Sequence, residues 1–134
     1  MTRRRKGEDG AAAVEFALVS IPAIILVLGA LQYGWYFYVS EQTSGAASTV
    51  ARKLAVGDCW GANEALNYTR NQAAQVTAVT KTPASITTAT PRGTAITVSV
   101  TSSADIVGFF PMPNGGNVTR VVTTRLEDTA PATC

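Results

Sequence analysis

The most prominent pattern in this chain is a long apolar stretch near its N-terminus. Between Gly10 and Ser40 the only charged side chain is Glu15, and residues 16–40 carry no charge at all. A helix over this uncharged stretch would be about 37 Å long, which is enough to cross a hydrocarbon core of about 30 Å with some tilt. The pattern therefore predicts one membrane-spanning helix over residues 16–40.

Apolar residues continue to recur at helical spacing after the membrane stretch, as far as Leu54. The basic side chains of Arg52 and Lys53 would suit the C-terminal end of a helix dipole, and Gly57 would end the helix. We therefore expect one continuous helix over residues 11–57. Its outer half needs a covering domain for its apolar stripe.

The rest of the chain, residues 58–134, has the pattern of a small α+β domain. Residues 61–75 predict a short helix, and residues 95–101 alternate between apolar and hydroxyl side chains, as a half-buried strand does. Weaker strand signals lie at residues 86–90 and 121–127. The many Ser and Thr residues would also suit a glycosylated stalk, but the alternation favours a sheet. The expected fold class is α+β, with a long N-terminal helix followed by a small antiparallel sheet.

Composition and charge narrow the function classes. The chain has 134 residues, no histidine and two cysteines, so a His-containing catalytic triad and a zinc site cannot be assembled from it. The net charge is +2, and only the basic cluster at residues 3–6 could contact nucleic acid. We expect a protein that is not an enzyme, holds no metal or cofactor, and has no nucleic-acid partner and no small-molecule substrate.

The charges that flank the apolar stretch predict its orientation. The basic cluster at residues 3–6 precedes the stretch, and the first charge after it is Glu41. By the positive-inside rule, we expect a single-pass membrane protein with a cytoplasmic N-terminus and an extracytoplasmic C-terminal domain. A cleaved secretory signal with an exit near Leu31 is the competing interpretation. It fits poorly because acidic residues interrupt the basic and apolar regions that a signal peptide needs.

A recognisable motif opens the apolar stretch. A basic leader ends in Gly10, and Glu15 and Phe16 occupy the fifth and sixth positions after it. This spacing resembles the processing site of type IV prepilins, and its detail is most similar to the TadE family of pseudopilins, which accompany the Tad (Flp) pilus system. Residues 33–57 and 121–127 resemble the same family more weakly.

The resemblance implies a non-catalytic minor pilin or pseudopilin that takes part in pilus assembly or adhesion at the cell surface. A membrane-embedded prepilin peptidase would cut between Gly10 and Ala11 and remove a leader of residues 1–10. The new ammonium group of Ala11 in one subunit would then pair with Glu15 of a neighbour, so other pilin subunits and the Tad assembly machinery are the implied partners. In the simpler interpretation, Glu15 merely lies near a helix N-terminus, where a negative charge is tolerated.

A second hypothesis is a membrane-tethered extracellular binding domain that is never cleaved or assembled. Phe109 and Phe110 lie in a segment, residues 106–116, that is more apolar than a solvent-exposed loop needs to be. These aromatic rings either cap the core of the domain or contact another subunit or a ligand.

The two cysteines, Cys59 and Cys134, would lie on the extracytoplasmic side, where disulfides persist. A bond between them would tie the C-terminus to the base of the long helix. Pairing between subunits and free thiols are the other possibilities.

Overall fold

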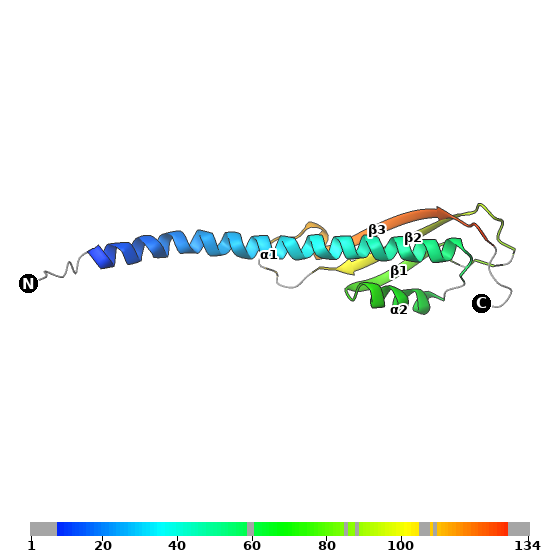
Figure 1. The fold of residues 1–134 in the computed structure, drawn as a ribbon, viewed down its shortest axis with the longest axis horizontal. Helices are drawn as coiled ribbons and strands as arrows, with labels where there is room; N and C mark the ends of the chain where they lie inside the picture. Colours follow the sequence, from blue (N-terminus) through cyan, green and yellow to red (C-terminus); the bar gives the residue numbers. More distant parts are fainter. Residues whose placement is uncertain are drawn as a thin grey trace, which may run out of the picture.

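The computed structural model describes residues 8–58, 61–84, 86–87, 89–104, 108 and 110–128. One long helix runs the length of the molecule, and a small sheet and a short helix pack along its C-terminal half (Figure 1). The elements are α1 (Glu8–Ala55), α2 (Ala62–Gln72), β1 (Val76–Thr82), β2 (Ala95–Ser103), the short 3-10 helix η1 (Pro113–Gly116) and β3 (Asn117–Arg125). This layout confirms the α+β fold class with its long N-terminal helix.

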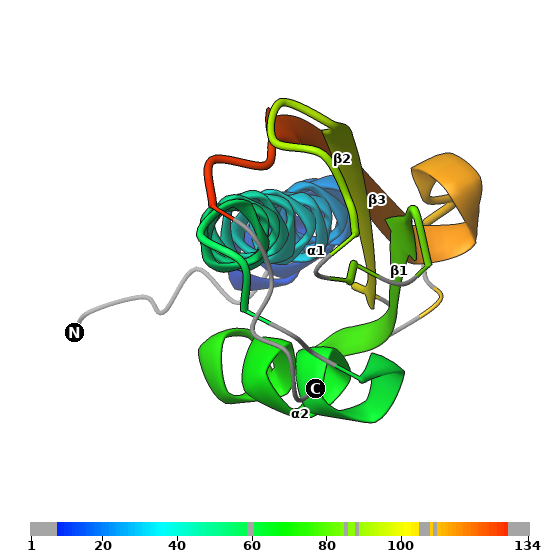
Figure 2. The ribbon, with the colours of Figure 1, turned by 90° about the vertical axis from the view of Figure 1, so that its right-hand side faces the viewer.

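The sheet is antiparallel and has the order β1-β2-β3. Along the central strand β2, Ile96, Val98 and Val100 are fully buried, while the hydroxyl side chains between them face away from the core. α1 packs against β2 and β3, and α2 lies beside β1 (Figure 2). The strict alternation of residues 95–101 therefore becomes the two faces of the sheet, as predicted.

Small side chains allow the C-terminal half of α1 to lie close to the sheet. The main core cluster joins apolar residues of α1 to the inner face of β2, and Leu126 closes it from the end of β3. The members of this cluster on α1 are Ala46, Ala47, Val50, Ala51 and Leu54. A second, smaller cluster of Val39, Ala104 and Val118 lies nearer the N-terminus of the molecule. The apolar residues that recur at helical spacing in the sequence therefore form the stripe of α1 that the folded domain covers.

α1 ends in a glycine-dependent cap. Gly57 has a φ of 86°, a left-handed conformation that costs glycine little. Its N–H donates to Leu54 O at 3.1 Å, and the N–H of Asp58 donates to Lys53 O at 3.2 Å. This pair of bonds satisfies carbonyl groups at the end of the helix in the manner of a Schellman motif. The helix therefore ends at Ala55, two residues before this glycine.

The strand expected at residues 86–90 is wrong. Among the described residues of that range, Thr87 and Thr90 form a turn in which the N–H of Thr90 donates to Thr87 O at 2.9 Å. Ile86 is nevertheless buried in the core. The third strand of the sheet is β1, an edge strand with exposed Thr residues and a bulge between Val76 and Ala78 that interrupts its alternation. The C-terminal strand expected at residues 121–127 begins earlier, at Asn117.

Candidate assembly site on the N-terminal helix

The N-terminal half of α1 extends beyond the folded domain without any cover (Figure 1). Among the described residues, α1 is the helix that is long and apolar enough to cross a membrane, and 0% of its most apolar window is buried. Phe16 and Leu26 are 75% and 74% exposed. An apolar surface of this size requires lipid or neighbouring helices around it. The chain therefore has the layout of a single-pass membrane protein.

The residues of the predicted processing motif lie in the first turns of α1. Gly10 and Ala11 are already helical, and Glu15 and Phe16 are exposed on the same helix. Nothing lies within 4 Å of the position that a Cβ on Gly10 would take. Residues four apart lie on one face of a helix, so Ala11 and Glu15 are one turn apart on the same side. The structure thus brings the N-terminal side of the motif and its carboxylate together on one exposed surface.

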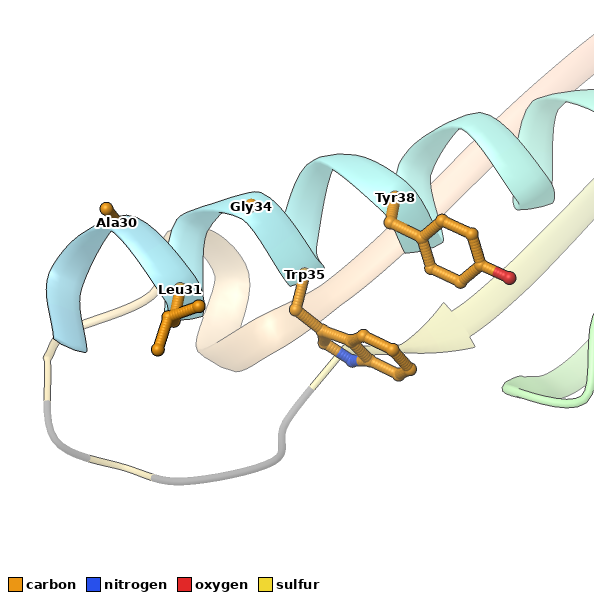
Figure 3. Close-up of a pocket in the computed structure, with 5 residues that line it drawn as sticks. All are labelled: Ala30, Leu31, Gly34, Trp35 and Tyr38. Carbon is orange, nitrogen blue, oxygen red and sulfur yellow. The ribbon is translucent and has the colours of Figure 1, made fainter. Parts of the chain in front are cut away.

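An open hollow lies further along the exposed part of α1. It has a volume of about 410 Å³ and is lined by Ala30, Leu31, Gly34, Trp35 and Tyr38. Figure 3 shows the side chains of Leu31, Trp35 and Tyr38 on one side of the helix, and the Trp35 and Tyr38 ring centroids are 5.3 Å apart. Because Gly34 has no side chain, another helix could approach the backbone closely here. We call these five residues the helix hollow.

The segment after Gly108 folds back onto α1 beyond the end of the sheet. The amide group of the Gln32 side chain donates to Phe110 O at 3.0 Å and accepts from Phe110 N–H at 3.2 Å. The hydroxyl of Tyr33 donates to Pro111 O at 3.2 Å. The Phe110 ring lies beside Gly29, 3.7 Å from the position of a Cβ built there. Phe110 is therefore half-buried against the helix.

Sequence reasoning did not identify Gln32 and Tyr33 as anchors of this segment. Both residues lie in the C-terminal half of the uncharged stretch, residues 16–40. The available signal was an amide side chain in an otherwise apolar stretch. Its partner lies 78 residues away in sequence, and no local pattern identifies that partner.

Three of the residues singled out in the sequence lie outside the described residues. They are Cys59, Cys134 and Phe109. The disulfide between the two cysteines remains a prediction, and so does an interface role for Phe109.

Comparison with known protein families gives a match, which lies on α1. Residues 10–52 match the family model of TadE-like proteins, so the match begins at Gly10 and ends three residues before the end of α1. No curated protein and no solved structure matches the chain. The TadE-like family is structural and is connected with the Tad pilus, which implies a pilus-related role. Residues 10–52 are thus similar to TadE-like proteins, the family that the motif around Gly10 resembles.

Proposed function

We propose that the chain is a non-catalytic minor pilin or pseudopilin of a Tad-type pilus, cut by a prepilin peptidase between Gly10 and Ala11. The observation that carries the proposal is the spacing of Gly10, Glu15 and Phe16 at the start of the TadE-like segment, on a helix whose apolar surface is uncovered. The chain would then divide into a leader (residues 1–10), the long helix (11–57) and an extracytoplasmic domain (58–134).

The position of the cleavage site suits a peptidase that works at the membrane surface. The basic residues of the leader would bind anionic headgroups and hold the bond at that surface. Gly10 lies in the first turn of α1, where the backbone N–H groups have no partner within the helix. Unwinding this turn into an extended substrate is therefore cheap, and a glycine allows the peptidase to approach the backbone closely.

Cleavage would create the partner that Glu15 needs. A carboxylate at the edge of a membrane is costly unless an opposite charge compensates it. The free ammonium group of Ala11 in a neighbouring subunit would supply that charge, and the pair would fix how far adjacent helices are staggered. The helix hollow around Gly34 supports the same proposal, because it offers a second place where a neighbouring helix can approach α1.

The alternative, a membrane-tethered binding domain, is not favoured. A tether needs neither a leader that ends in glycine nor a glutamate five positions later. Phe110, which that hypothesis would use to hold a ligand, is half-buried against α1, and Gln32 binds both of its backbone polar groups. Little of its surface is left for a ligand.

The proposal is tested by expressing the full chain with and without a prepilin peptidase and reading the N-terminus of the membrane-bound product by mass spectrometry. We expect a product that starts at Ala11, appears only with the peptidase and is lost in the Gly10→Leu variant. Glu15→Gln is the matched variant: it should still reach the membrane but should be depleted from sheared pili. An intact leader under both conditions would overturn the proposal, and a product that starts near Leu31 would overturn the membrane span itself.

A further inference from the structure

The segment Phe110–Pro113, which we call the apolar segment, reaches far down α1 toward the membrane. The sheet ends beside Val39, where Ala104 and Val118 pack. The Phe110 ring, by contrast, lies beside Gly29. The ten residues from Gly29 to Val39 span about 15 Å of helix. The segment therefore runs from Met112, which packs on the Val39 cluster at the end of the sheet, to Phe110, whose ring lies about that distance farther along the exposed part of α1 (Figure 1).

The depth of Gly29 in a bilayer follows from the length of the apolar stretch. A hydrocarbon core of about 30 Å takes about 20 helical residues. Wherever such a window is placed between Ala11 and Ser40, it includes Gly29. On the domain side the window is limited by Arg120, whose guanidinium donates to the Ser40 hydroxyl and belongs at headgroup level or beyond. The Phe110 ring beside Gly29 thus lies within the hydrocarbon core, and Met112 beside Val39 lies near its domain-side boundary.

Four backbone polar groups of the apolar segment have partners within the protein. Gln32 pairs with both the N–H and the C=O of Phe110, and the Tyr33 hydroxyl donates to Pro111 O. Pro111 and Pro113 have no N–H to satisfy, and Met112 O accepts from the N–H of Gly115 at 3.2 Å. An unsatisfied backbone group in lipid costs several kcal/mol, whereas a loop in water has no need of these partners.

The side chains of the apolar segment are also compatible with a lipid environment. Residues 106–116 contain no charged side chain. Within the apolar segment, Pro111 and Pro113 are exposed, and Phe110 and Met112 are half-buried. An exposed surface of this kind would be unfavourable in water but is compatible with acyl chains.

From this position and chemistry we infer that the apolar segment is a second membrane contact, which inserts into the domain-side leaflet next to the spanning helix. The inference rests on the proposed span of α1 but not on cleavage at Gly10. Together, α1 and the apolar segment hold the folded domain against the bilayer at a fixed height and rotation, instead of leaving it free on a single anchor.

The chain offers a direct probe, because its two methionines are Met1 and Met112. The full chain, with isotope-labelled methionine methyl groups, is placed in nanodiscs of phosphatidylethanolamine and phosphatidylglycerol and followed by NMR. Met112→Leu assigns the signal. Two paramagnetic agents are compared: a nitroxide on the acyl chain near the headgroup, and a gadolinium chelate in water. We expect the nitroxide to broaden the Met112 signal more strongly than the chelate does.

Val56 provides the matched control, since it is 57% exposed just after the end of α1, sixteen residues beyond Ser40 and about 24 Å farther along the helix axis. The methyl group introduced by Val56→Met should show the reverse order, with stronger broadening by the chelate. A Met112 signal that follows this water-side pattern would overturn the inference. A Met112 signal that neither agent reaches would overturn it too, because a second copy or another protein would then cover the segment. None of these results depends on a peptidase, so they are independent of the cleavage test.

Discussion

Thr43 of α1 and Ser102 of β2 form a hydroxyl pair that joins the helix to the sheet. Both residues are 0% exposed, and Thr43 Oγ1 lies 2.7 Å from Ser102 Oγ and 2.6 Å from Val39 O. A hydroxyl has one proton to donate and a carbonyl only accepts. Thr43 therefore donates to Val39 O and accepts from Ser102, so the Ser102 hydroxyl depends on Thr43.

The variant Thr43→Val should destabilise the fold by about 1–3 kcal/mol, because it leaves the buried Ser102 hydroxyl without its acceptor. Adding Ser102→Ala removes the hydroxyl that lost its partner and should restore most of the lost stability. This result would show that the hydrogen-bonded pair, and not the shape of the side chain, is the cause. The measurement is the free energy of unfolding of the full chain by urea in detergent micelles.

Thr97→Val is the matched control for the buried pair. Thr97 Oγ1 lies 3.2 Å from Thr123 Oγ1 on the accessible face of the sheet, where water can replace either hydroxyl. The expected change is within about 0.5 kcal/mol. If Thr43→Val costs no more than Thr97→Val, the buried pair does not stabilise the contact between α1 and β2.

Among the elements, those with one dominant local pattern could be predicted from the sequence, and those defined by distant partners could not. The helix around Val50 and the strand around Val98 each bury one regular face, so their periodicity is visible. Ile86 is buried too, but it lies just before a turn, and a single buried residue cannot distinguish such a segment from a strand. The same limit applies to Gln32, whose place in the apolar stretch was visible but whose contact with Phe110 depends on how the whole chain folds.

Two glycines, one within the covered half of α1 and one just after its end, predict opposite effects for the same substitution. Gly57→Ala forces a side chain into the left-handed conformation at φ 86° and should destabilise the fold by about 1–2 kcal/mol. Gly45 is exposed within α1, and nothing lies within 4 Å of a Cβ placed on it. Gly45→Ala should therefore stabilise by up to about 1 kcal/mol, because alanine is a better helix former. Thermal unfolding followed by circular dichroism measures both changes, and equal signs would contradict this assignment of the helix end.

On the scale of the whole molecule, two chemically different halves share one helix. The half near Gly10 presents apolar side chains with no cover, and the half near Leu54 is buried under a sheet rich in Thr and Ser. Both halves could be predicted from the sequence, the first from its uncharged apolar stretch and the second from apolar residues that recur at helical spacing. The TadE-like match covers the helix and stops before the sheet, so the shape of the domain and the return of its apolar segment to Gly29 are visible only in the folded chain.

The proposed orientation of the molecule predicts how its lysines react. Lys6 precedes the span, while Lys53 and Lys81 follow it. With a cytoplasmic N-terminus, a membrane-impermeant amine reagent added to spheroplasts without a prepilin peptidase should modify Lys53 and Lys81 but leave Lys6 intact. Burial lowers the pKa of Lys81, although Glu64 opposes the shift, so its amine is neutral and reactive more often than an ordinary lysine. Peptide mass spectrometry measures each modification.

Permeabilised spheroplasts supply the control for this labelling, because all three lysines should then react. The peptidase-free strain keeps the leader attached, so protection of Lys6 reports its compartment and not its removal. Modification of Lys6 in intact spheroplasts, with Lys53 and Lys81 protected, would show the opposite orientation, with the folded domain in the cytoplasm. The leader would then lie on the opposite face from the one at which a prepilin peptidase cuts, and the proposed processing at Gly10 would fail together with the orientation.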